Sequence, residues 1–197
     1  MVPTDRDSES HSSHKGLLMS RNLTPLALAF SLLFSLGLLA RGEDKHAKHE
    51  KPSANAAFDR FKDLAGEWVG KGNHDGAVID AKIVYKVSSG GSVVVETIDP
   101  GGPHEMVTLI HPDGPSLLLT HYCMIGNQPH MKASPKSGDN KVAFDFVRAT
   151  NMKSDKDMHM HSVTFTFVDK DTLRTEWTNY SDGKESGKAI FELKRKK

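Results

Sequence analysis

Gly66-Glu67-Trp68-Val69-Gly70-Lys71-Gly72 is the stretch that decides the fold. Side chains alternate between the two faces of a β-strand, so Trp68 shares a face with the glycines at 66, 70 and 72. A large indole on that face would close one end of a β-barrel, while the glycines leave space beside it and let the strand bend. The stretch therefore predicts a first strand over 66–71, with its tryptophan in the interior.

Downstream of this strand, short β-rich segments alternate with clusters of Gly, Pro, Asp, Asn and Ser, which are typical of turns. These segments predict nine further strands, at 79–87, 93–98, 107–110, 117–122, 129–133, 142–147, 163–168, 173–180 and 188–194. No helical periodicity separates them, which excludes a parallel α/β fold. The chain is therefore predicted to be all-β, a ten-stranded antiparallel up-and-down β-barrel.

Upstream, the pattern changes to that of one short amphipathic helix over 55–64. Phe58, Phe61 and Leu64 recur at a spacing of three residues. Ser53 or Asn55 is a suitable N-cap, and Gly66 follows the expected end of the helix. The barrel domain is thus predicted to span residues 55–197 and to begin with this helix.

The extended G-x-W-x-G-x-G stretch after a short helix resembles the start of the lipocalin-like (calycin) β-barrels. With about nine further strands it is similar to nitrobindin-type haem barrels and to uncharacterised exported bacterial lipocalin-like domains. The resemblance implies a barrel with an internal ligand. For the nitrobindins it also implies a haem-binding histidine in the last strand, but the last strand here, Gly187 to Lys194, contains no histidine.

Composition narrows the classes of partner. The 197 residues carry a formal net charge of +1, which gives no electrostatic case for binding nucleic acid. The single cysteine, Cys123, excludes an internal disulfide and a zinc site made of cysteines alone. No G-x-S-x-G, phosphate loop or dinucleotide fingerprint occurs, so the sequence assigns no catalytic residue.

The N-terminal region predicts export. Residues 26–40 form an uncharged run of 15 residues, shorter than the roughly 20 that a membrane-spanning helix needs, which suits the core of a signal peptide. We expect residues 1–42 to be the signal region, with translation starting at Met19 and cleavage after Gly42. Residues 43–54 then form a flexible linker. The mature protein is expected to be periplasmic or extracellular, with no membrane attachment.

Two stretches combine His, Cys and Met in an unusual way, at 120–124 and 157–161. His159 and His161 are expected on one strand face, about 7 Å apart along the chain, on the interior side. His121 and Cys123 share a face of another strand. If both pairs converged, His121, Cys123, His159 and His161 would suit zinc or copper. The alternative is that the histidines line a pocket as polar groups without a metal. Glu96 and Glu105 flank a turn and are expected to be solvated.

The function predicted from the sequence is the binding of a small, mostly apolar molecule inside the barrel of a monomeric protein. The expected aromatic walls are Trp68, Phe144, Phe146, Phe165, Phe167 and Trp177. The expected polar contacts are His121, Tyr122, His159 and His161. The alternative is a metal- or haem-binding barrel that uses the His/Cys set, with redox or isomerase chemistry. No cofactor is assigned firmly; zinc, copper and haem are the options.

Overall fold

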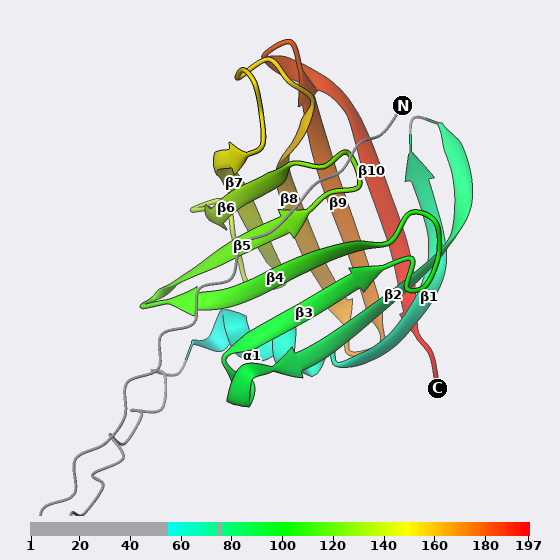
Figure 1. Ribbon diagram of the computed structural model, residues 1–197. Coiled ribbons are helices and arrows are strands. Elements are labelled where there is room, and N and C mark those ends of the chain that lie inside the picture. The colour runs from blue at the N-terminus through cyan, green and yellow to red at the C-terminus, as the bar shows by residue number, and fades with distance from the viewer. Residues whose placement is uncertain (1–54, 75) are drawn as a thin grey trace, which may run out of the picture. The chain divides into compact units, whose positions relative to one another are not determined.

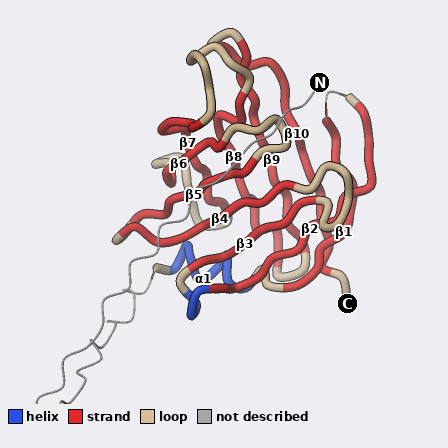
Figure 2. Tube along the Cα trace, in the orientation of Figure 1, coloured by secondary structure: helices blue, strands red, loops and turns tan. Residues whose placement is uncertain are grey.

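The computed structural model describes residues 55–74 and 76–197, which fold into one short helix and a closed β-barrel (Figure 1). Almost all of the regular structure is β-strand (Figure 2). The helix α1 spans Ala56–Asp63, and a 3₁₀ turn, η1, spans Ser89–Gly91. The strands are β1 (Gly66–His74), β2 (Ala77–Ser88), β3 (Val93–Ile98), β4 (Met106–Asp113), β5 (Ser116–Tyr122), β6 (Gln128–Ala133), β7 (Lys141–Thr150), β8 (His159–Asp169), β9 (Thr172–Ser181) and β10 (Lys184–Arg195).

Each strand pairs antiparallel with its neighbours in sequence, and β1 also pairs with β10, which closes the barrel. The predicted all-β, ten-stranded antiparallel barrel with one helix before its first strand is therefore confirmed. Several strands are longer than predicted, because strand pairing continues through polar residues such as Asn73 and Lys184. Closure leaves no free sheet edge among the ten strands.

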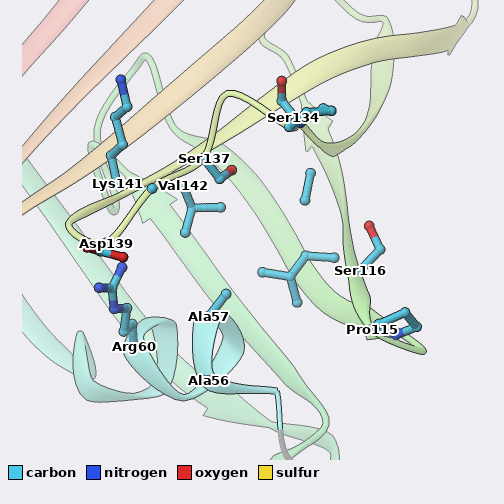
Figure 3. Close-up of a pocket in the computed structure, with 14 residues that line it drawn as sticks. Ala56, Ala57, Arg60, Pro115, Ser116, Ser134, Ser137, Asp139, Lys141 and Val142 are labelled. Atoms are coloured by element: carbon cyan, nitrogen blue, oxygen red, sulfur yellow. The ribbon is translucent and has the colours of Figure 1, made fainter.

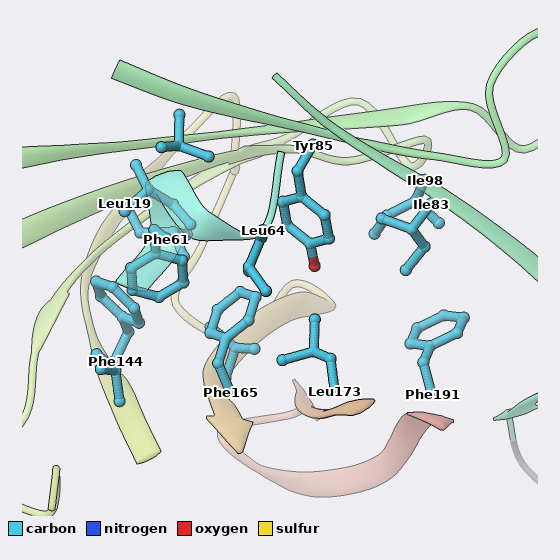
Figure 4. Packing of buried hydrophobic residues seen from close by; sticks show 14 of the residues in the cluster. Phe61, Leu64, Ile83, Tyr85, Ile98, Leu119, Phe144, Phe165, Leu173 and Phe191 are labelled. Carbon is cyan, nitrogen blue, oxygen red and sulfur yellow. The ribbon is translucent and has the colours of Figure 1, made fainter. Parts of the chain in front are cut away.

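The helix α1 lies across one end of the barrel (Figure 1). Its N-cap is Asn55, whose side-chain oxygen accepts a hydrogen bond from the amide of Phe58 at 3.0 Å. Phe61 is completely buried and packs against Phe144, Phe165 and Phe167, with ring centroids 5.0–6.0 Å apart (Figure 4). The hydrophobic face of the helix thus completes the core at this end.

Trp68 is fully buried next to α1, as predicted. Its indole nitrogen donates a hydrogen bond to the carbonyl of Leu64 at 2.7 Å, and the guanidinium of Arg195 lies 4.4 Å from its ring centre. Arg195 also donates to the carbonyls of Asp63 and Ala65. The first strand, the last strand and the end of the helix are therefore held together at one tryptophan.

The glycines of β1 do not leave the space that we expected beside Trp68. A Cβ on Gly70 would lie 1.9 Å from the carbonyl oxygen of Glu192, and one on Gly72 would lie 2.9 Å from the ring of Phe191. Because β10 approaches so closely, these positions accept only hydrogen. The glycines serve close packing of β1 on β10.

The strand β8 is irregular at its start. Its pairing with β9 shifts between Met160 and Ser162, where a β-bulge places one extra residue, His161, in β8. The bulge breaks the two-residue alternation. As a result Met160, between His159 and His161 in the chain, packs against the core opposite the buried Asn179.

The expected signal region 1–42, the start at Met19 and the linker 43–54, with the possible cap Ser53, lie outside the described residues. Within the described part of the chain, no helix is both long enough and apolar enough to cross a membrane.

Candidate functional site

A row of four buried polar side chains crosses the inner surface of the barrel. Tyr85, Glu96, Thr108 and His121 come from β2, β3, β4 and β5, and each is the direct cross-strand partner of the next. All four are almost completely shielded from solvent. Direct partners in an antiparallel pair carry side chains on the same face, so the four form a continuous line, here called the polar row.

The centre of the polar row is Glu96. The hydroxyl of Tyr85 donates to its Oε1 at 2.6 Å, while its Oε2 has no hydrogen-bond partner. Burial raises the pKa of the Glu96 carboxyl, and the hydroxyls of Tyr85 and Thr108 offset part of this effect. Burial and the neighbouring carboxyl in turn raise the pKa of Tyr85 well above its ordinary value. A carboxyl group held in this way can change its protonation state when a ligand arrives.

His121 forms the other end of the row. Its Nδ1 lies 3.0 Å from the hydroxyl of Thr108, and its ring packs on that of Trp177 with centroids 4.6 Å apart. Burial lowers the pKa of His121 to about 4, so the imidazole is neutral at physiological pH. Its Nε2 has no partner. His121 therefore offers one free, uncharged hydrogen-bonding nitrogen inside the protein.

Some buried polar atoms of the barrel have no hydrogen-bond partner. Among the described residues, six buried side-chain atoms have no hydrogen-bond partner: Glu96 Oε2, His121 Nε2, Asn127 Oδ1, Thr175 Oγ1, Trp177 Nε1 and Asn179 Oδ1. Each buried polar group left unpaired costs about 1–3 kcal/mol. Each such atom in a native protein calls for a partner, such as an ordered water molecule or a bound ligand.

The predicted aromatic walls divide into two groups. Trp68, Phe144, Phe165 and Trp177 are buried in the core, and Phe167 is partly buried against Phe61. Phe146 instead stacks on histidines at the start of β8. Tyr122 does not reach the interior, contrary to our prediction. It is 47% exposed, because alternation along β5 buries Leu117, Leu119 and His121 and turns Tyr122 outward.

His159 and His161 lie together, but they bind each other. His159 Nδ1 donates to the carbonyl of Asp157 at 2.8 Å, and its Nε2 lies 3.0 Å from Nδ1 of His161. The ring of His161 is stacked between Phe146 and Tyr180. Burial, and to a smaller extent the positive charge of His159, lowers the pKa of His161, while Asp145 opposes them. Both nitrogens of His159 are occupied, so this pair is not arranged to hold a metal.

The four predicted metal ligands are not gathered at one place. His121 packs on Trp177, Cys123 follows β5 with its amide bonded to Asn127, and the two other histidines pair with each other. Within residues 55–74 and 76–197, no group of three or more His, Cys, Asp or Glu side chains could hold a metal ion. For haem, the described residues offer one buried imidazole nitrogen without a partner, Nε2 of His121.

Sequence reasoning missed Glu96, Thr108 and Tyr85. Glu96 was expected to be solvated, but it is completely buried. The available signal was the alternation in β3, where Val94, Glu96 and Ile98 share one face and two of the three are apolar. The partner Glu105 does lie at the surface, where it accepts a hydrogen bond from the amide of Gly101.

Two cavities open elsewhere. One of about 560 Å³ lies between α1 and the segments 115–117 and 133–142 (Figure 3). Another of about 290 Å³ is lined by 146–149 and 152–155. None of the predicted ligand-binding residues lines the first cavity, and only Phe146 lines the second. Neither is lined by any of the six unpaired buried atoms, so the polar row is the stronger candidate site.

Comparison with known proteins supports the fold. The crystal structure of Rv2717c from M. tuberculosis matches with a TM-score of 0.50 and 13% sequence identity, over 72% of this chain and 98% of that chain. A protein of unknown function from the DUF3598 family of Nostoc punctiforme matches with a TM-score of 0.41 and 10% identity, over 68% and 48%. No protein family model and no curated protein matches the sequence. At 13% identity, the match to Rv2717c supports the barrel fold alone.

Proposed function

We propose that this barrel binds a small, mostly apolar molecule in its interior, against the aromatic walls and the polar row. The observation that carries the proposal is the set of six unpaired buried polar atoms, which includes Glu96 Oε2, His121 Nε2 and Trp177 Nε1. Apolar walls with a few polar groups are the usual composition of a small-molecule site. We also propose a relationship to the nitrobindin-type barrels. Only the architecture of the barrel supports this relationship.

A residue on β9, across the barrel from the polar row, is a suitable position at which to test this proposal. Thr175 on β9 is completely buried, with an unpaired hydroxyl, beside Trp177. Thr178 on the same strand pairs in register with Lys188 and Ser162 and lies on the other face. Substituting leucine at either position adds the same volume, but only Thr175→Leu adds it to the interior.

Native mass spectrometry of the gently purified protein should detect a bound small molecule. The uncharged fluorescent probe N-phenyl-1-naphthylamine should bind to the wild type and to Thr178→Leu. Binding to Thr175→Leu should fall by about tenfold or more, with the fold retained in circular dichroism. A protein that carries no molecule and binds no probe would rule the proposal out.

The metal- or haem-binding alternative has a separate readout. The described residues do not assemble the predicted four ligands, so we expect metal well below one equivalent in protein purified without a histidine tag. One equivalent of metal, or a haem absorption band that is lost in His121→Ala, would favour the alternative.

Export and the monomeric state belong to the same proposal. The predicted signal region precedes the described barrel, and the mature protein is proposed to act in the periplasm or outside the cell, without a nucleic-acid or membrane partner. The N-terminus of the protein recovered from cells should be Glu43. A recovered N-terminal peptide from residues 1–18 would contradict both the cleavage and the start at Met19.

A further inference from the structure

The interior of the barrel holds an acidic group without a lysine or arginine beside it. Glu96 is a completely buried carboxyl, and none of the described lysines or arginines is buried. The titratable groups packed around Glu96 are Tyr85 directly and His121 through Thr108. Both are uncharged at neutral pH, because burial raises the pKa of Tyr85 and lowers that of His121 to about 4. An ionised Glu96 therefore has no cationic partner in the protein, although buried charges usually have one.

The unpaired atoms are mostly hydrogen-bond acceptors. Oδ1 of Asn127 is one of them, because the amide nitrogen of the same side chain donates to the carbonyl of Met158. Oδ1 of Asn179 is an acceptor as well, and so is Oε2 of Glu96 when the carboxyl is ionised, whereas only Trp177 Nε1 must donate. A molecule that donates hydrogen bonds and favours the ionised carboxyl would therefore suit most of these atoms.

The two ends of the polar row each hold one unpaired atom. Oε2 of Glu96 accepts when the carboxyl is ionised, and the hydroxyls of Tyr85 and Thr108 favour that ionised form, since both lower the pKa of the carboxyl. At the other end, Nδ1 of His121 lies 3.0 Å from the hydroxyl of Thr108, and its Nε2 is a further hydrogen-bonding position.

Aromatic rings pack at both ends of the polar row. Tyr85 lies edge-on against Trp68, with centroids 6.4 Å apart, and its hydroxyl points into the barrel (Figure 4). At the other end, Trp177 packs on His121. Such rings offer an apolar surface on which the body of an organic molecule can pack.

We propose that the interior ligand is a protonated organic amine with an apolar body, whose ammonium group pairs with Oε2 of Glu96 while its body packs on the aromatic walls. This inference rests on the proposed function and specifies the chemical class of the ligand. An anionic molecule such as a fatty acid is disfavoured beside the ionised carboxyl, because no buried lysine or arginine is there to pair with it.

The test compares three probes with the same phenyl body and different charges: 2-phenylethylamine, 2-phenylethanol and 3-phenylpropionate. Titration calorimetry with the full-length purified protein at pH 7.5 should show the amine binding about tenfold or more tightly than the alcohol, and the acid not binding. Glu96→Gln should reduce the affinity for the amine to that for the alcohol and leave the alcohol unchanged. Glu192→Gln, on the outer face of β10, is the matched control and should change nothing.

The outcomes separate the two proposals. If the alcohol binds as well as the amine, or the acid binds best, the amine inference is wrong while an interior ligand site stands. If none of the three probes and no N-phenyl-1-naphthylamine binds, the proposed function itself fails. Loss of both amine and alcohol binding in a folded Glu96→Gln would show that Glu96 holds the interior in shape rather than pairing with the amine, which also overturns the inference.

A second variant keeps the test valid if Glu96→Gln does not fold. Tyr85→Phe retains the carboxyl but removes the hydroxyl that lowers its pKa. Because the amine pairs with the ionised carboxyl, its affinity should rise as the pH rises through the pKa of Glu96. That rise should move to higher pH in Tyr85→Phe. Tyr180→Phe, which lies at the histidine pair, should not move it, and an identical pH profile in Tyr85→Phe would contradict the inference.

Discussion

Two regions of the barrel differ in how completely their buried polar groups are hydrogen-bonded. One is the end covered by α1, and the other is the polar row. At the α1 end, the indole nitrogen of Trp68 and the guanidinium of Arg195 both have partners, and Phe61 fills the remaining space. In the polar row, buried atoms of Glu96 and His121 are left without partners. The first region is built for stability. The second gives up stability, which is typical of a site that a ligand completes.

The largest effect on stability should come from removing Trp68, at the end of the barrel covered by α1. Trp68→Ala deletes a fully buried indole together with its hydrogen bond to Leu64 and its contact with Arg195. We expect the free energy of unfolding to fall by about 3–5 kcal/mol in urea denaturation. Val69→Ala, on the exposed face of the same strand, should change it by less than about 0.5 kcal/mol. A loss of similar size in both variants would contradict the view that the buried contacts of Trp68 stabilise this end of the barrel.

An intermediate effect should come from pH, acting on the polar row. The pKa of His121 is lowered from 6.5 to about 4, so its contribution to stability is complete above pH 6.5. As the pH falls to 4, the unfolded chain gains a proton that the buried imidazole does not, and the free energy of unfolding falls by about 3 kcal/mol. The contribution of Glu96 to the free energy of unfolding changes with pH in the opposite direction. Because its pKa is raised, Glu96 favours the folded state at low pH, and this contribution is lost as the pH rises.

Comparing the wild type with His121→Gln separates the pH-dependent contribution of His121 to stability from that of Glu96. The difference between the free energies of unfolding at pH 7 and pH 4, measured by urea denaturation, should be about 3 kcal/mol larger in the wild type. Parallel pH profiles for the two proteins would show that His121 is not shielded as the structure describes.

The smallest effect should be a gain in stability. Thr175→Val replaces a buried hydroxyl that has no partner with a methyl group of nearly the same size. The ligand-free protein should be stabilised by up to about 1 kcal/mol in thermal or urea unfolding. Thr178→Val on the other face should be close to neutral. Destabilisation by Thr175→Val would instead show that an ordered water molecule satisfies the hydroxyl.

The strands and much of the core could be predicted from the sequence. Turn residues separated all ten strands, and alternation placed Trp68, Phe144, Phe165 and Trp177 in the interior. The site was predicted less well. His121 was identified, but Tyr122 was expected to contact the ligand although it points outward, and Glu96 was taken for a surface residue. Strand ends are where alternation is least reliable, because a bulge such as the one at His161 shifts every side chain beyond it.

By itself, the sequence determined the strands, the order in which they follow one another, and the direction of most side chains, because alternation is a local property of extended backbone. Only the tertiary structure decided which side chains meet. The register of the β3–β4 and β4–β5 pairings placed Glu96 and His121 on either side of Thr108, and the bulge in β8 accompanies the pairing of His159 with His161. These adjacencies depend on hydrogen bonds between strands, whose register is set by the turns and the pairing and not by the alternation within one strand.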